Sequence, residues 1–547
     1  MPRPNRYCEP CVNCGEYVME GAGVSYKENG KWITAHNYGE CPVKPAELNP
    51  YEGFELDDYQ QAVRDSLVTG VRGPHIMVCA RAGSGKTTVQ CFSLWDILDI
   101  DPALSVAMIA FGHEDGERIK ARCPKCVDGA TTHSLGLRLI RDFFPGTKIN
   151  NRKTMELVEA VCGAHDEAIS LRNYVRELLS KIKADAIRAD NLEGMSDLIQ
   201  SYDLDIPFDY RREAIQKANE ALKLGMDLET WGVNFDDMIY LVAILDIPIP
   251  EYDIVAIDEV QDLCRSQIIF LGKLVVTGAR VIAVGDPQQS LYLFRGARPD
   301  SFYQVRRLLE TTDRGVVNLG MPICYRQSRA IIRHAQQWVP ELQARPDAPE
   351  GEIILGYPIK KMIEHLRPGD CVISRTNGPL AQVSHILGVQ GIPFYMRGGR
   401  REAGWINWLI DLLSVERGPT QDIKELLKRL AAWLEEKRQR CKPMKYAEYA
   451  SRSEVITVFG KQSESVDDLK KRVKALYRKP KNIDDCIIIS TIHLAKGSEA
   501  ENIWHIHPEN CPHPLAKTKD QQDQEQNAMY VAVTRGKDKY IECKGVA

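Results

Sequence analysis

The segment ARAGSGKTT at residues 80–88 combines glycines, a lysine and hydroxyl side chains in a spacing that suits phosphate binding. It follows the apolar run HIMVCA, and this order predicts a strand, a phosphate loop and a helix. The glycines let backbone N–H groups close around phosphates, the lysine reaches the β and γ phosphates, and a threonine hydroxyl binds Mg²⁺. Ala80 stands where this pattern more often has glycine. The expected contacts to a nucleoside triphosphate are Ala82, Gly83, Ser84, Gly85, Lys86, Thr87 and Thr88.

Two adjacent carboxylates end another apolar run much later in the chain, in EYDIVAIDEVQDL. In phosphoryl transfer one such carboxylate holds Mg²⁺ while its neighbour polarises the attacking water. A solvated acidic turn after a core strand is the alternative for Asp258 and Glu259. The matched phosphate loop favours the catalytic interpretation, with Thr87 and Asp258 holding magnesium and Lys86 and Glu259 acting on the phosphates and the water.

Strand-like apolar runs recur along the chain and are separated by longer helical or polar stretches. This alternation predicts an α/β fold with parallel sheets. Two stretches are instead typical of charged helices, and we expect them to be insertions. The expected strands cover residues 76–80, 104–110, 254–258, 280–284, 370–374, 486–490 and 503–507, and the expected helical insertions cover 136–235 and 401–483.

The composition is that of a globular protein, with 547 residues, 44% of them hydrophobic and 27% charged. No stretch approaches the roughly 18 apolar residues of a membrane span, and MPRPNRYCEP lacks the core of a signal peptide. We therefore expect a cytoplasmic protein without a membrane partner. The 16 cysteines are spread along the chain and several lie in apolar runs, which favours reduced thiols over a disulfide framework.

The net charge of −4 gives no global sign of nucleic-acid binding, so any such surface must be local. The string KKRVKALYRKPK in the second helical stretch carries seven Lys or Arg and no acid. Either a solvated helix face or a nucleic-acid contact explains such a run.

The N-terminal segment gathers several thiols and an imidazole within CEPCVNCGEYVMEGAGVSYKENGKWITAHNYGEC. A segment this small needs a stabilising cross-link such as a metal ion, and a CxxC pair supplies half of a tetrahedral zinc site. A histidine and a cysteine further along can close the site across a hairpin turned at Asn29-Gly30, with free thiols as the alternative. A second CxxC, Cys123 and Cys126, has no nearby partner pair and fits ordinary thiols. The expected ligands of one structural Zn²⁺ are Cys11, Cys14, His36 and Cys41, with Cys8 as a spare ligand.

Further motifs follow in a characteristic order. They are LDDYQQAV at 56–63, VAMIAFGHEDGERIKARC at 106–123, ATTHSLGLRLI at 130–140, AVGDPQQSLYLFRGA at 283–297, ICYRQSRAI at 323–331, TIHLAKGSEAENI at 491–503 and MYVAVTRGKDKYI at 529–541. In that order they resemble the Q motif, motif Ia, the TFHSL segment and motifs III, IV, V and VI of the superfamily 1 helicases of the UvrD/Rep/PcrA type. DEVQD is similar to motif II of the same family. The resemblance covers roughly residues 50–547.

The resemblance implies two RecA-like parallel-sheet domains of the P-loop NTPase type, with helical insertions and ATP in the cleft between the domains. The implied function is an ATP-dependent DNA helicase that moves 3′–5′ on single-stranded DNA and unwinds duplex. FRGA after motif III, THSLG and Lys496 in motif V are as in the 3′–5′ branch of the family. The alternative is an ATP-driven single-stranded DNA translocase or sensor that acts with a nuclease, replication or repair partner without processive unwinding. DNA repair, phage replication, plasmid maintenance and antiphage defence all use such proteins.

The same resemblance divides the chain into five expected parts. They are a zinc finger at 1–48, RecA-like domain 1A at 49–135 and 236–318, helical insertion 1B at 136–235, RecA-like domain 2A at 319–400 and 484–547, and a shortened insertion 2B at 401–483. The second insertion is much shorter than the regulatory subdomain of the family, which implies reduced accessory control.

Roles of individual residues around the nucleotide also follow from the resemblance. Gln60 would read the adenine edge, Tyr325 would stack on the adenine, and Glu499 would touch the ribose or the DNA side. Gln289 stands just beyond a strand end, where an amide can sense the γ-phosphate. The arginine fingers from the second domain would be Arg326 and Arg535, which neutralise charge in the transition state.

Aromatic and basic residues in the motifs provide faces for base stacking and a cation for phosphate. His113 stands where motif Ia customarily has its DNA contact, and core packing is the alternative for Phe294. The expected contacts to single-stranded DNA are Phe111, His133, Ser134, Tyr292, Phe294, Arg295 and His493.

Overall fold

The computed structural model of the chain divides into two units, Met1–Glu55 and Leu56–Ala547. It describes residues 49–547 except 111, 164–168, 203, 292–297, 299, 416–417, 442 and 546–547, together with short strands within residues 1–48. In the first unit β4 (Gly23–Glu28) and β5 (Lys31–His36) pair antiparallel with Glu28 opposite Lys31, which confirms the expected hairpin. The remaining strands of this unit are β1 (Arg3–Pro4), β2 (Glu9–Pro10) and β3 (Tyr17–Val18).

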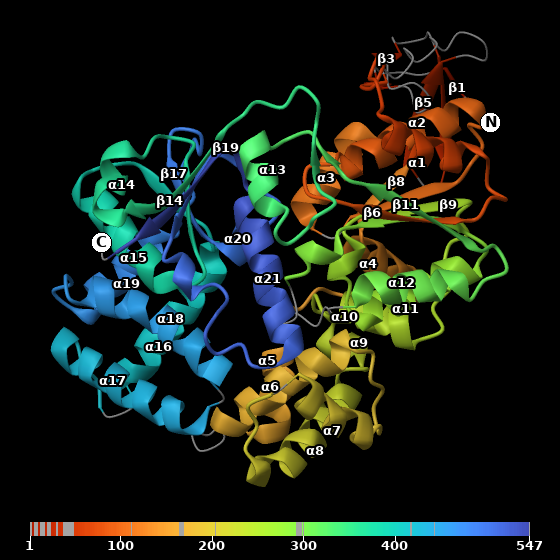
Figure 1. Ribbon diagram of the computed structural model, residues 1–547. Coiled ribbons are helices and arrows are strands. Elements are labelled where there is room, and N and C mark those ends of the chain that lie inside the picture. The colour runs from red at the N-terminus through yellow and green to blue at the C-terminus, as the bar shows by residue number, and fades with distance from the viewer. Residues whose placement is uncertain are drawn as a thin grey trace. The chain divides into compact units, whose positions relative to one another are not determined.

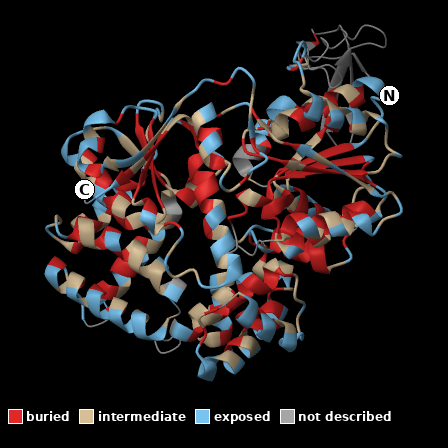
Figure 2. Ribbon diagram, in the orientation of Figure 1, coloured by how far each residue is buried: buried red, intermediate tan, exposed pale blue. Residues whose placement is uncertain are grey.

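Six parallel strands form the first large sheet of the second unit, in the order β11-β6-β10-β9-β7-β8 (Figure 1). Helices cover both faces of a parallel sheet, so its strands are apolar on both sides, and Figure 2 shows them largely buried. The strands are β6 (His75–Ala80), β7 (Val106–Ala110), β8 (Asp128–Thr131), β9 (Ile254–Ile257), β10 (Arg280–Gly285) and β11 (Val316–Met321). β11 thus spans the boundary expected between residues 318 and 319.

The helices around this sheet begin at defined caps. Asp57 and Gln60 form a capping box at the start of α1, and Thr131 and Ser134 form another at the start of α4. Such boxes satisfy N–H groups that the first turn of a helix leaves without a partner. The helices are α1 (Asp58–Val68), α2 (Lys86–Ile100), α3 (His113–Arg122), α4 (Thr132–Phe143), α10 (Asp237–Ile244), α11 (Arg265–Val276) and α12 (Ser301–Glu310).

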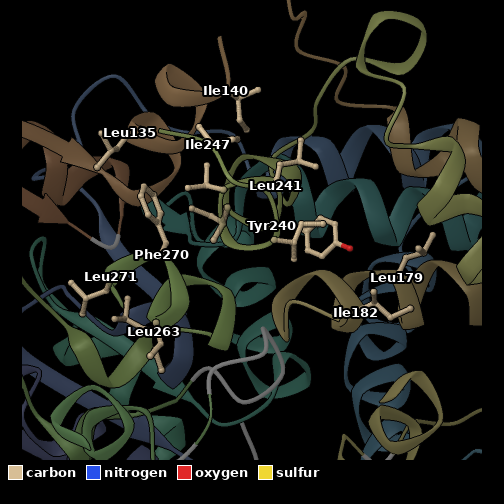
Figure 3. Close-up of a cluster of buried hydrophobic side chains, with 14 of the residues drawn as sticks. Leu135, Ile140, Leu179, Ile182, Tyr240, Leu241, Ile247, Leu263, Phe270 and Leu271 are labelled. Carbon is tan, nitrogen blue, oxygen red and sulfur yellow. The ribbon is translucent and has the colours of Figure 1, made fainter. Parts of the chain in front are cut away.

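The first stretch expected to be helical forms α5 (Lys153–Cys162), α6 (Ile169–Ala184), α7 (Leu192–Ser201), α8 (Phe208–Leu224) and α9 (Leu228–Trp231). Its apolar side chains join the core of the first sheet domain, and Figure 3 shows Leu179 and Ile182 of α6 beside Tyr240 of α10. A buried ion-pair cluster adds to this contact, because Asp237 lies 2.8 Å from Lys153 and 2.7 Å from Lys183. The insertion is therefore joined to the sheet domain by both apolar packing and charge.

The second large sheet is also entirely parallel, in the order β14-β19-β18-β15-β17-β16. All seven apolar runs expected to be strands lie in one of the two sheets, which confirms the α/β fold with parallel sheets. The strands are β14 (Glu352–Pro358), β15 (Cys371–Ser374), β16 (Phe394–Met396), β17 (Ile487–Thr491), β18 (Ala500–Ile506) and β19 (Gly536–Lys544). The neighbouring elements are β12 (Ile323–Cys324), β13 (Gln343–Ala344), α13 (Arg329–Ala335), α14 (Ile359–His365), α15 (Asn377–Val389), α20 (Ile492–Ala495) and α21 (Lys519–Val533).

The second helical stretch forms α16 (Gly399–Val415), α17 (Ile423–Arg440), α18 (Pro443–Gly460) and α19 (Val466–Leu476). The basic run lies on α19 and just after it, where Val473 and Leu476 are buried while Lys471 and Lys474 are exposed. Lys471 and Lys474 therefore face solvent, as both a solvated face and a nucleic-acid contact require. Among the described residues, no helix has the length and apolar character needed to cross a bilayer.

Candidate nucleotide and nucleic-acid site

The phosphate loop connects β6 to α2, as the sequence predicts. Gly83 and Gly85 have φ values of 71° and 79°, in the left-handed region that residues with a side chain rarely adopt. Lys86 is the first residue of α2, so the loop presents the N-terminal end of a helix, where backbone N–H groups favour an anion. The buried hydroxyl of Ser84 has no hydrogen-bond partner within the described part of the chain. These features fit a bound triphosphate.

The carboxylates of motif II lie directly beside the phosphate loop. Thr87 Oγ1 donates a hydrogen bond of 2.5 Å to Asp258 Oδ2, and Lys86 Nζ lies 3.1 Å from Glu259 Oε1. Hydroxyl and carboxylate oxygens are ligands that Mg²⁺ prefers. Thr87 and Asp258 therefore fit the magnesium site that the sequence predicts.

The two carboxylates are held in different electrostatic states. Burial and the neighbouring Glu259 charge raise the pKa of Asp258 to about 6. Burial acts in the same direction on Glu259, but Lys86 and Lys496 outweigh it and lower the pKa of Glu259 to about 2. Glu259 also has a left-handed φ of 53°, which costs a non-glycine residue about 1–2 kcal/mol. An ionised carboxylate on strained backbone is consistent with a catalytic role.

The residues expected near adenine lie at the edge of the phosphate loop. The Tyr325 backbone N–H donates to the Gly83 carbonyl at 2.9 Å, and the Tyr325 hydroxyl donates to the Asp57 carboxylate. Tyr325 is accessible to a ligand, since 37% of the residue is exposed. Gln60 is buried and donates through Nε2 to the Ser84 carbonyl at 3.1 Å. Its amide thus supports the loop in the structure, and adenine reading would require it to change partners.

The two candidate arginine fingers adjoin the loop of motif V. Arg326 Nε lies 2.9 Å from Glu499 Oε2, and Arg535 Nη1 donates to the Ser498 carbonyl at 3.2 Å. Arg535 is buried, and burial together with the Arg326 charge lowers its pKa to about 10, so it remains protonated at neutral pH. A Cβ built on Gly83 would lie 3.1 Å from Arg326 Cβ. Arg326 of the second sheet domain therefore lies against the phosphate loop of the first.

The candidate γ-phosphate sensor Gln289 ends the short helix η3 (Pro287–Gln289) just after β10. Its Nε2 donates to Asp286 Oδ2 at 2.8 Å, and its carbonyl accepts from Lys496 Nζ at 2.5 Å. Lys496 also forms a buried ion pair with Asp262, whose pKa burial raises to about 6. Sequence reasoning did not assign Asp286 and Asp262 to the site. Their position inside the GDPQQS and DEVQD strings was the available signal.

The DNA-contact candidates that the structure describes lie on both sheet domains. The His133 ring stacks on Phe235 with centroids 3.6 Å apart and planes 16° apart, and 60% of Phe235 is exposed. Burial lowers the pKa of His133 to about 4, so the ring is neutral at neutral pH. Ser134 belongs to the α4 capping box, and burial lowers the pKa of His493 to about 3. Phe111, Tyr292, Phe294 and Arg295 lie outside the described residues.

The family of this chain follows from its matches to known protein families. The chain matches the UvrD/REP helicase N-terminal domain over residues 61–310 and the UvrD-like helicase C-terminal domain over residues 420–541. It belongs to the UvrD/Rep helicase family. The first match contains β6, β7, β8, β9 and β10 of the first sheet, and the second contains β17, β18 and most of β19 of the second sheet. Both matches confirm the resemblance seen in the motifs.

Several curated members of the UvrD/Rep family match the chain at low identity. The ATP-dependent DNA helicase PcrA of Staphylococcus epidermidis is 21% identical over 392 residues, which are 62% of this chain and 51% of the relative. PcrA of Leuconostoc citreum is 23% identical over 61% of this chain and 49% of its own length. The ATP-dependent DNA helicase Rep of Buchnera aphidicola is 23% identical over 48% and 42%. The chain therefore spans about half the length of the curated relatives it matches.

Phe235 is a candidate site residue of this UvrD/Rep-family chain that the sequence alone did not predict. Phe235 lies just before α10, and nothing in its local pattern separates an exposed stacking ring from a core aromatic.

The expected zinc ligands lie outside the described residues, apart from the backbone of His36 at the end of β5. Across the described ranges, no group of three or more His, Cys, Asp or Glu residues could hold a metal ion.

Proposed function

We propose that this UvrD/Rep-family chain is an ATP-dependent DNA helicase that moves 3′–5′ along single-stranded DNA and unwinds duplex. The supporting observation is the meeting of two sets of residues at one place. Lys86 and Glu259 come from the first sheet domain, and Arg326 and Arg535 come from the second. ATP binding would close the cleft between the domains and hydrolysis would reopen it. Alternating grip by the two domains on a strand then produces stepwise movement.

The residues divide the chemistry of hydrolysis between them. Lys86 would exchange Glu259 for the β and γ phosphates, which frees the Glu259 carboxylate to orient and polarise water. Arg326 and Arg535 would neutralise charge that develops on the γ-phosphate. A magnesium ion on Thr87 and Asp258 would supply further charge neutralisation when bound. Gln289 would respond to the γ-phosphate and pass its presence along motif III.

Duplexes with a single-stranded tail test the proposed direction. With ATP, the purified protein should release the strand from a 3′-tailed duplex and leave a 5′-tailed duplex intact. Lys496 supports this direction, because it stands in motif V as it does in the 3′–5′ branch of the family. ATP turnover should rise strongly when single-stranded DNA is added, because Gln289 stands a few residues before the expected base-stacking segment.

The same experiment separates the helicase from its main alternative. Strand release from the 5′-tailed duplex alone would place the protein in the opposite branch. DNA-stimulated turnover without strand release from either duplex would support a translocase or sensor that acts with a nuclease, replication or repair partner. A blunt duplex of the same sequence is the control, since it offers no strand for loading.

A structural zinc ion in the N-terminal unit is a separate proposal. It rests on the spacing of Cys11, Cys14, His36 and Cys41 and on the hairpin of β4 and β5, which would bring the two halves of the site together. Elemental analysis of the purified chain should find about one zinc per molecule, and Cys14→Ser should release it. ATP turnover of that variant should stay near the parent value, since the motor residues lie in the second unit. Protein free of zinc would rule the proposal out.

A further inference from the structure

Arg81 lies within the phosphate loop, directly after the last residue of β6. Its side chain is almost buried, and Nη1 donates to Asp286 Oδ1 at 2.8 Å and to Gln288 Oε1. Its other terminal nitrogen, Nη2, donates to the carboxylate of Glu341. The forked guanidinium of Arg81 therefore binds two carboxylates at once. The compact ammonium group of a lysine would bind both poorly.

The first of these carboxylates supports the candidate phosphate sensor. Asp286 is fully buried, and its Oδ2 accepts hydrogen bonds from Gln289 Nε2 at 2.8 Å and from the Tyr530 hydroxyl at 3.3 Å. A buried carboxylate is costly to leave without its cation. Arg81 thus holds in place the Asp286 carboxylate, whose other oxygen accepts from the Gln289 amide.

The second carboxylate belongs to the other sheet domain. Glu341 lies between α13 and β13, and 51% of its side chain is exposed. Tyr530 of α21 makes a parallel link, because its hydroxyl accepts from the Ala82 backbone N–H at 3.1 Å. Opening of the cleft would take Glu341 and Tyr530 away from the loop together. The surroundings of Asp286 would therefore change when the cleft opens.

We propose that Arg81 is a positioning residue that couples closure of the cleft, through Glu341, to the orientation of Gln289, through Asp286. This inference rests on the proposed ATP-driven function and adds to it a route by which domain closure reaches the phosphate sensor. Arg81 itself needs no contact with the nucleotide in this role. It transmits the position of the second domain through its two carboxylate partners.

Glu341→Gln tests the coupling while leaving the buried contact between Arg81 and Asp286 in place. Under saturating single-stranded DNA, kcat for ATP should fall about threefold, as expected for loss of a partly exposed ion pair, while KM for ATP stays unchanged. Glu341→Asp should restore most of the turnover because it restores the charge. The thermal midpoint should not move, since Glu341 is half exposed and supports no core. Glu350→Gln is the matched control, because Glu350 forms an exposed ion pair with Arg333 away from the loop.

A double variant distinguishes coupling from independent effects. Lysine in place of Arg81 cannot bridge both carboxylates, so Glu341→Gln should lower kcat little further in an Arg81→Lys background. Parental kcat in Glu341→Gln, or fully independent effects of the two substitutions, would overturn the inference alone. A parent protein without ATP turnover would overturn the proposed function and this inference with it.

Discussion

Replacing Lys86 by alanine is expected to lower ATP turnover by about 10²- to 10³-fold, the usual cost of removing a preorganised group that stabilises charge in the transition state. Lys86 begins α2 and lies 3.1 Å from Glu259, so it stands between the phosphate site and the carboxylate expected to orient water. Its loss removes a phosphate contact. It also leaves Glu259 without its nearest cation, which raises the pKa of that carboxylate from its lowered value.

Turnover should be measured with and without a single-stranded oligonucleotide, and binding of that oligonucleotide should be measured separately. DNA binding without ATP should survive in Lys86→Ala because the lysine is directed at the nucleotide site. Lys217→Ala is a suitable control, since Lys217 pairs with Glu220 on the surface of α8. Undiminished turnover in the Lys86 variant would mean that the loop does not hold the phosphates.

The second large effect is expected from Arg535→Lys, which should lower kcat by about 10³-fold, the low end of what an arginine finger contributes. Arg535 is buried and donates to the carbonyls of Val531 and Ser498, so its guanidinium is held by backbone at the end of α21. Lysine keeps the charge but cannot reproduce the fork that holds backbone and phosphate together. KM for ATP should change far less than kcat, because the contact forms mainly in the transition state.

The comparison of kcat with KM also separates catalysis from folding. A purely structural role would lower the thermal midpoint and the amount of folded enzyme without a selective loss of kcat in the folded fraction. Arg333→Lys offers a matched control, because Arg333 is an exposed arginine of α13 in the same sheet domain. If Arg535→Lys keeps the parental kcat, transition-state charge is neutralised by another group, with Arg326 the first candidate.

The strands that the sequence predicts are those whose both faces are buried. The runs at β6, β9, β10 and β17 are mainly apolar because each lies inside a parallel sheet covered on both sides. The sequence did not predict strand β19, although it lies between β14 and β18 in the sheet. Its first half, GKDK, is polar and reaches the end of the sheet, where Lys539 pairs with Glu352 and Lys537 with Glu501. A hydrophobic pattern cannot identify a strand whose charges are neutralised by partners distant in sequence.

The candidate nucleotide site was likewise predicted in part from the sequence. The phosphate loop and the pair of residues expected to hold magnesium, Thr87 and Asp258, follow from local patterns, because each motif combines a strand end with the residues that it presents. The DNA contacts and the zinc site remain predictions. Most of their residues lie outside the part of the chain that the structure describes.

By itself, the sequence predicted an α/β fold with parallel sheets, the helical insertions and the motifs that identify a UvrD/Rep-family chain, since these depend on periodicity and short spacing. The division into two sheet domains followed from the resemblance that those motifs carry. The tertiary structure alone decided how Arg81 joins Asp286 to Glu341, how Phe235 stacks on His133, and how Glu259 adopts its left-handed backbone. Each of these features depends on elements that only the folded chain brings together. Arg81 and Glu341 are 260 positions apart, so their contact exists only when the two sheet domains meet. No local pattern carries the information for such a pair, because it is the packing of separate domains that creates it.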